Sequence, residues 1–114
     1  MRSFLLVIGS IILSIGLKAQ VISLPAPQKE GGMPLMEALS KRQSARAFSG
    51  KPLSNQMLSN LLWAAWGINR SEDGRRTAPS SHNDQNTVLY CALSEGLYTY
   101  DAQNHSLILV RETD

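Results

Sequence analysis

Apolar residues at helical spacing predict a first, short helix over residues 34–43. Pro34 suits the first helical position, where its missing N–H group would have had no helical partner. The apolar side chains of this segment fall at positions i, i+1 and i+4, which places them on one face: Leu35, Met36 and Leu39. We expect this helix to end near Ser44.

A second helical pattern begins after Ser54, which is a suitable N-cap residue. An apolar stripe follows at helical spacing, and two tryptophans flank it: Met57, Leu58, Leu61, Leu62 and Ala65, with Trp63 and Trp66. Gly67 fits the left-handed position that often follows the last turn of a helix. We interpret the stripe as core packing rather than as a cofactor site.

The C-terminal third has the short apolar runs that are typical of strands. Residues 87–93 are nearly continuously apolar and predict a buried strand, and residues 97–100 and 107–110 predict two more. The polar residues 101–106 connect the last two strands and are expected to close a hairpin, with His105 facing solvent in the turn.

Polar segments separate these elements. Residues 21–33 mix Pro, Gly and charged residues and predict an extended or flexible lead-in. Residues 69–76 and 77–85 predict loops, because Gly, Pro, Ser, Asn and Asp are concentrated there. Helices followed by strands predict an α+β fold.

The first 19 residues have the three parts of a secretory signal peptide. Arg2 supplies a positive start, residues 4–15 form an apolar run, and small residues near Ala19 suit cleavage. The run is shorter than the roughly 20 apolar residues that a membrane-spanning helix needs. We therefore expect a secreted or periplasmic protein, and a retained membrane anchor is the alternative.

Charge and cysteine content narrow the functional classes. Of the formal charge of +2, Arg2 and Lys18 belong to the signal segment, and the rest of the chain has nine basic and nine acidic residues. A nucleic-acid partner is therefore not expected. The single cysteine, Cys91, allows no internal disulfide and is expected to be buried and inert. One Cys and two His do not favour a metal site.

A first polar constellation lies where the first predicted helix ends: Arg42, Gln43, Ser44 and Arg46. Planar guanidinium groups suit paired hydrogen bonds to phosphate oxygens. In an extended chain, Ser44 and Arg46 would lie on the same side. The alternative is a solvated surface, which two arginines near a helix end form more often.

A second constellation spans residues 75–85, just before the 87–93 run. It begins with Arg75 and Arg76 and continues through Pro79, Ser80, Ser81, Asn83 and Gln85. Hydroxyl groups, amides and backbone donors in one loop could read the donor and acceptor edges of a flat heterocycle. Taken alone, a solvated loop is the simpler interpretation.

Together and in this order, these segments resemble the FMN-dependent nitroreductase family. Residues 42–48 match its Arg-x-Ser-x-Arg-x-Phe pattern, and residues 58–67 match its Leu-Leu-Trp-Ala-Ala-x-Gly helix. Residues 76–81 match Arg-Thr-x-Pro-Ser-Ser, and residues 96–101 look like the branch related to peptide-azoline oxidases. The match covers nearly all of residues 34–110.

The resemblance implies a nitroreductase-like fold, with helices packed on an antiparallel sheet, and an oxidoreductase that uses FMN. The FMN phosphate and ribityl chain would be held by Arg42, Gln43, Ser44 and Arg46. The isoalloxazine ring would be lined by Pro79, Ser80, Ser81, Asn83 and Gln85.

The same resemblance implies the partners of the reaction. NAD(P)H or another electron donor would reduce the flavin, which would then reduce a nitroaromatic, a quinone or a similar small-molecule acceptor. No catalytic side chain is implied, because the cofactor supplies the chemistry and the protein supplies orientation. The family form is a homodimer with FMN at the subunit interface.

The sequence departs from the family pattern in two ways. Asn86 and Thr87 stand where many members have Pro-Trp. The family domain is also considerably longer, so we expect residues 34–114 to be its N-terminal part, following a signal peptide at 1–19 and a lead-in at 20–33. Three alternatives stay open: an exported binding module without catalysis, an inactive fragment, and an exported α+β protein that binds a partner through its hairpin edge.

Overall fold

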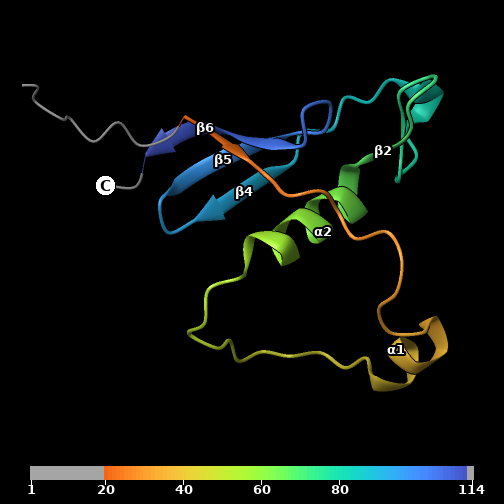
Figure 1. The fold of residues 1–114 in the computed structure, drawn as a ribbon, viewed down its shortest axis with the longest axis vertical. Helices are drawn as coiled ribbons and strands as arrows, with labels where there is room; N and C mark the ends of the chain where they lie inside the picture. The colour runs from red at the N-terminus through yellow and green to blue at the C-terminus, as the bar shows by residue number, and fades with distance from the viewer. Residues whose placement is uncertain (1–19, 113–114) are drawn as a thin grey trace, which may run out of the picture.

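The computed structural model describes residues 20–112, which form two helices, a four-stranded sheet, a two-stranded hairpin and one 3₁₀ turn (Figure 1). The signal peptide expected at residues 1–19 lies outside the described residues. Within residues 20–112, no helix has both the length and the apolar character that crossing a membrane requires.

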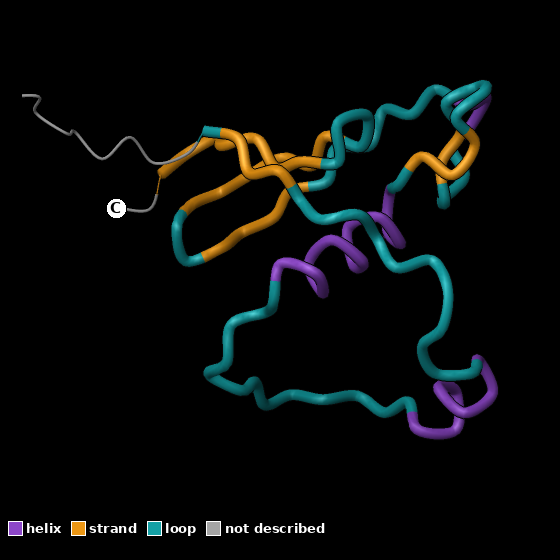
Figure 2. Tube along the Cα trace, in the orientation of Figure 1, coloured by secondary structure: helices purple, strands orange, loops and turns teal. Residues whose placement is uncertain are grey.

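The larger sheet has four strands: β1 (Val21–Ser23), β4 (Tyr90–Leu93), β5 (Gly96–Asp101) and β6 (Ser106–Glu112). Their order is β1-β6-β5-β4, and every neighbouring pair is antiparallel (Figures 1 and 2). In this register, Tyr98 of β5 lies between Cys91 of β4 and Leu109 of β6. The expected antiparallel sheet is therefore confirmed.

Helix α2 (Asn55–Trp66) covers one face of this sheet (Figure 1). Its residues at i, i+4 and i+8 are buried against strand residues, and the core consists mainly of Leu58, Leu62, Trp66, Tyr98, Tyr100 and Leu107. Core packing by the stripe is confirmed, but the buried face is rotated, since Met57 and Leu61 are both 59% exposed. Ser54 caps the helix as predicted, because its hydroxyl accepts a hydrogen bond from the Met57 N–H at 3.1 Å.

Gly67 follows α2 in an extended conformation, with φ −71° and ψ 155°, so the predicted left-handed conformation is wrong. Its N–H donates to the Trp63 carbonyl at 2.7 Å. A Cβ atom at Gly67 would overlap the Trp63 side chain and would lie 2.5 Å from the same carbonyl oxygen. Glycine is thus required here by the close approach of the chain to the helix, and not by its backbone dihedrals.

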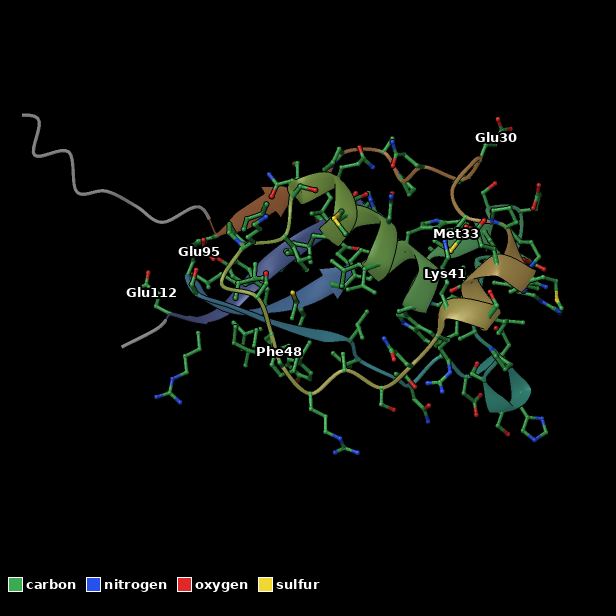
Figure 3. All side chains as sticks on the ribbon, turned by 90° about the horizontal axis from the view of Figure 1, so that it is seen from below. Glu30, Met33, Lys41, Phe48, Glu95 and Glu112 are labelled. Atoms are coloured by element: carbon green, nitrogen blue, oxygen red, sulfur yellow. The ribbon has the colours of Figure 1, made fainter. Side chains whose placement is uncertain are left out.

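Helix α1 (Leu35–Lys41) forms at the predicted place, but it buries none of its side chains. Leu35 and Met36 are 72% and 75% exposed, and Phe48 in the following segment is 93% exposed. Figure 1 shows α1 on the side of α2 away from the sheet, and Figure 3 shows where Phe48 lies in the following segment. Within residues 20–112, the apolar face of α1 has no packing partner.

The two edge strands differ from the sequence analysis. The 87–93 run forms a strand only in β4, and the edge position leaves Tyr90 58% exposed, so the prediction of a buried strand is wrong. Val21–Ser23, expected in an extended or flexible lead-in, is extended and pairs with β6 as strand β1. Leu24 follows it into the core, and this burial orders the segment.

The 101–106 connection closes the β5–β6 hairpin as predicted, but His105 does not face solvent. Its Nδ1 lies 2.7 Å from the Tyr100 hydroxyl, and its Nε2 lies 2.6 Å from Ser59 Oγ and 3.0 Å from the Pro25 carbonyl. Ser59 is fully buried and donates to the same carbonyl at 2.5 Å. One tautomer satisfies every group: Tyr100 donates to Nδ1, and the Nε2–H donates to Ser59 Oγ. His105 therefore links the turn to α2 and to the N-terminal segment.

Candidate functional site

A small hairpin after α2 begins the candidate site. Residues 69–76, expected as a loop, contain most of strands β2 (Ile68–Arg70) and β3 (Arg75–Arg76). Gly74, at φ +69°, shapes the turn between them, and its N–H donates to the Arg70 carbonyl at 2.9 Å. An Asp-Gly pair between strands is a known hairpin signal, so Asp73 and Gly74 are the features that could have predicted this element.

The irregular segment expected over residues 77–85 contains the 3₁₀ turn η1 (Ser81–Asn83). His82, Asn83 and Gln85 all have positive φ, at 51°, 55° and 48°. Three such residues within four positions make a tightly folded loop, which the polar sequence permits because Asn tolerates this conformation well. The loop runs at the upper right of Figure 1, beyond the C-terminal end of α2.

Two side chains hold this loop against the hairpin and α2. Arg76 Nε donates to Gln85 Oε1, and its Nη1 donates to the Trp66 carbonyl, both at 3.0 Å. The Arg76 guanidinium also lies over the Trp66 ring, 4.7 Å from its centroid. Gln85 Nε2 in turn donates to the Gly74 carbonyl and to Asn83 Oδ1, both at 2.9 Å. Gln85, predicted to contact a flavin ring, is thus occupied in supporting the loop.

A pocket of about 430 Å³ opens between the hairpin and the loop. We call it the arginine pocket, and it is lined by Arg70, Arg75, Arg76, Ala78, Pro79, Ser80, His82 and Asn83. Of the five residues predicted to line a flavin ring, Pro79, Ser80 and Asn83 line this pocket, and the exposed Ser81 lies beside them in η1. The structure therefore gathers three of these five residues around one cavity, of the size that small ligands occupy.

The first predicted constellation has different surroundings. Arg42, Gln43, Ser44 and Arg46 follow α1 and are all exposed. Within residues 20–112, neither the Arg42 nor the Arg46 side chain has a hydrogen bond or an ion pair. Figure 1 shows α1 far below the loop that carries η1, so one chain does not bring the two constellations together.

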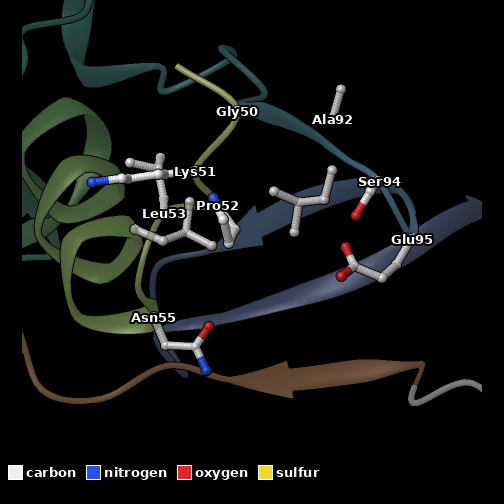
Figure 4. A pocket seen from close by; sticks show the side chains of 10 residues that line it. Gly50, Lys51, Pro52, Leu53, Asn55, Ala92, Ser94 and Glu95 are labelled. Atoms are coloured by element: carbon white, nitrogen blue, oxygen red, sulfur yellow. The ribbon is translucent and has the colours of Figure 1, made fainter. Parts of the chain in front are cut away.

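A second pocket of about 430 Å³ lies between the segment before α2 and the β4–β5 turn (Figure 4). Lys51 and Glu95 face it from these two sides, and Leu58 and Leu93 supply apolar walls. No side chain that the sequence singled out for binding lines this pocket.

Burial perturbs two titratable groups near the core. It raises the pKa of the Tyr100 hydroxyl above its ordinary value, and the charge of Arg76 opposes this effect. Cys91, expected to be buried, is only half-buried, and its partial burial raises the pKa of the thiol, which disfavours the reactive thiolate. Within the part of the chain that the structure describes, no cluster of three His, Cys, Asp or Glu side chains could hold a metal ion.

The similar proteins come from one family. The sequence profile of the nitroreductase family matches residues 39–114. A candidate nitroreductase of Methanocaldococcus jannaschii is 30% identical over 86 residues, which cover 70% of this chain and 43% of that protein. The crystal structure of a candidate nitroreductase from Ralstonia eutropha JMP134 is 49% identical, with a TM-score of 0.78 over 83% of this chain and 45% of that one. This chain therefore spans less than half the length of these relatives.

Proposed function

Because this chain belongs to the nitroreductase family, we propose that it is the N-terminal, flavin-binding part of an FMN-dependent oxidoreductase. The bound flavin would supply two-electron chemistry, accepting hydride from NAD(P)H or another donor and passing it to a nitroaromatic, quinone or similar acceptor. The chain would supply binding, orientation and hydrogen bonds, as expected where no acid–base pair of side chains stands at the site.

The observation that supports this proposal most is the arrangement of the 79–85 loop. Gln85 and Arg76 hold the loop, and its conformation leaves the Ser81 hydroxyl and the Asn83 Nδ2 without hydrogen-bond partners among residues 20–112. These donors stand beside a cavity walled on one side by Pro79. A polar edge beside an apolar surface suits a flat heterocycle such as the isoalloxazine ring.

The phosphate end of FMN would lie against the exposed constellation of Arg42, Gln43, Ser44 and Arg46. Two guanidinium groups without partners suit an anionic group, but a single chain gives them no opposite wall. We therefore propose a homodimer in which α1 and its neighbours from one copy approach the 79–85 loop of the other. The exposed apolar face of Leu35, Met36 and Leu39 would be buried in that contact.

An FMN titration of the full chain, followed by flavin fluorescence, tests the proposal. Saturable binding is expected, and Arg46→Ala should weaken it about tenfold or more, since charge-assisted hydrogen bonds to phosphate would be lost. Lys41→Ala is the matched control, because it removes a neighbouring positive charge that is already paired with Glu37 at 2.6 Å. Ser81→Ala should weaken binding by a smaller factor.

The alternatives are distinguished by this titration together with an NADH-oxidation assay and a thermal melt of the same chain. FMN binding without NADH-driven turnover indicates a binding module that lacks catalysis. A chain that melts cooperatively but does not bind FMN indicates an unrelated binding role and would overturn the flavin proposal for this chain. A chain that neither melts cooperatively nor binds FMN is an inactive fragment.

We propose that the protein is exported, on the pattern of residues 1–19. Cell fractionation of a bacterial expression host should place the mature protein outside the cytoplasm, with an N-terminus near Gln20 in its intact mass. Retention of residues 1–19 in the membrane fraction would instead support an anchor.

A further inference from the structure

The β2–β3 hairpin places two arginines directly opposite each other. Arg70 and Arg75 are cross-strand partners in its register. Like charges in directly opposite positions repel, which destabilises a two-stranded ladder. A third arginine, Arg76, lines the same cavity, and His82 stands beside them. Three guanidinium groups therefore face one small volume.

The charges of this cavity are only partly compensated. None of the described residues that line it is acidic. Asp73, in the hairpin turn, pairs with Arg75 Nε at 3.0 Å, and both side chains are about half exposed. Glu72 in the same turn and Asp84 after η1 are close in sequence, but neither lines the cavity or forms an ion pair with these arginines within residues 20–112. The lining therefore has a net positive charge.

Each guanidinium group also keeps N–H groups that are free to bind a ligand. Arg70 uses Nε on Asn69 at 3.3 Å and Nη2 on the Arg76 carbonyl at 3.1 Å, which leaves Nη1. Arg76 uses Nε and Nη1, which leaves Nη2. Arg75 uses only Nε, on Asp73. Within residues 20–112 these remaining groups have no acceptor, while the bonds already made fix two of the three guanidinium planes.

We propose that the arginine pocket binds the anionic group, carboxylate or phosphate, of the small molecule that exchanges electrons at this site. Planar, partly fixed guanidinium groups suit the paired oxygens of such anions. The pocket shares Pro79, Ser80 and Asn83 with the proposed flavin site, so a bound anion would lie beside the ring. The identity of this molecule as a substrate rests on the proposed function, whereas the binding of an anion does not.

Two pairs of probes, titrated with no electron donor present so that none of them reacts, separate the sources of the anion. 4-Nitrobenzoate against neutral 4-nitrobenzyl alcohol represents an acceptor, and 2′-phospho-ADP-ribose against ADP-ribose represents a phosphorylated nicotinamide donor. The second pair tests the 2′-phosphate, since both of its members have a charged diphosphate. Calorimetric titration of the full chain should show 4-nitrobenzoate or 2′-phospho-ADP-ribose binding about tenfold or more tightly than its counterpart. The double variant Arg70→Gln/Arg75→Gln should remove that difference. Lys51→Gln, which removes a charge from the other pocket, should preserve it.

Each outcome decides the proposal. Equal binding within both pairs, no binding of any probe, or a preference that survives the double substitution would overturn it. The single substitutions are measured beside the double variant, and a thermal melt establishes that it folds. Its Tm should not fall, because the double substitution removes the repulsion between two like charges. FMN binding is measured separately. Unchanged FMN affinity in the double variant means that these arginines bind the anionic group of the substrate and not the FMN phosphate. Loss of FMN affinity would instead assign these arginines to the flavin phosphate and overturn the substrate assignment.

Discussion

The two helices of this chain have similar apolar patterns and opposite surroundings. In α2, Leu58 and Leu62 are 7% and 5% exposed, because the sheet lies against them. In α1, Leu35 and Met36 remain 72% and 75% exposed. A periodic apolar face therefore indicates that a helix needs a packing partner, but it does not identify that partner. The partner of α2 is the sheet of the same chain, and the partner that we propose for α1 is a second copy.

The largest difference between the two regions is expected from truncation of a leucine in each. Leu107 is 0% exposed at the centre of the core, and Leu107→Ala should lower the free energy of unfolding by about 2–5 kcal/mol. Leu39 is 55% exposed, and Leu39→Ala should change the free energy of unfolding by less than about 0.5 kcal/mol. Urea denaturation followed by circular dichroism at low protein concentration measures both. Similar losses would mean that α1 is packed within one chain.

A pair of histidine substitutions is expected to show the next largest difference. His105→Asn removes the ring that joins Tyr100 and Ser59, and should cost about 1–3 kcal/mol in unfolding free energy because buried hydroxyls lose their partner. His82→Asn is the control, since His82 is exposed and also has a positive φ. Thermal melts measure both variants. An unchanged Tm for His105→Asn would refute the structural role of this network.

Two glycines extend the comparison to the backbone. Gly67→Ala should lower the free energy of unfolding by about 1–3 kcal/mol, since the new Cβ would overlap the side chain and the carbonyl oxygen of Trp63. The carbonyl belongs to the helix backbone and cannot move away freely. Gly50→Ala lies in open space in the outlying segment and should change the Tm by little. If Gly67→Ala were neutral in a thermal melt, the close approach at the end of α2 would be wrong.

The smallest expected effect is on the reaction rate of the Cys91 thiol, and it is measured without substituting any residue. Burial raises the pKa of this thiol, so the reactive thiolate is scarcer in the folded chain at a given pH. Its reaction with a disulfide reagent should be slower in buffer than in urea, and the pH profile of the rate should move to higher pH. By linkage, the same shift favours folding below the pKa of the unfolded thiol and loses that contribution as pH rises through the folded value. Equal rates in buffer and urea would show an exposed thiol.

Much of the candidate site follows from local sequence. The polar loop of residues 77–85 contains five of the eight residues that line the arginine pocket, and its composition predicted an irregular conformation. Arg70 and the β2–β3 hairpin were missed, because three-residue and two-residue strands have no measurable periodicity. The role of Gln85 as a support was also missed, since its partners Arg76 and Gly74 meet it only in the folded loop.

The sequence by itself determined the elements whose causes are local. Ser54 at the start of α2, the spacing of Leu58 and Leu62, and the β5–β6 hairpin all depend on residues within one or two turns of each other. The tertiary structure alone decided which face of α2 is buried and that Val21–Ser23 is a strand. It also decided that His105 bonds to Ser59, 46 residues away. These outcomes depend on partners that are distant along the chain, and free energy from burial and pairing is gained only where the fold brings such partners together.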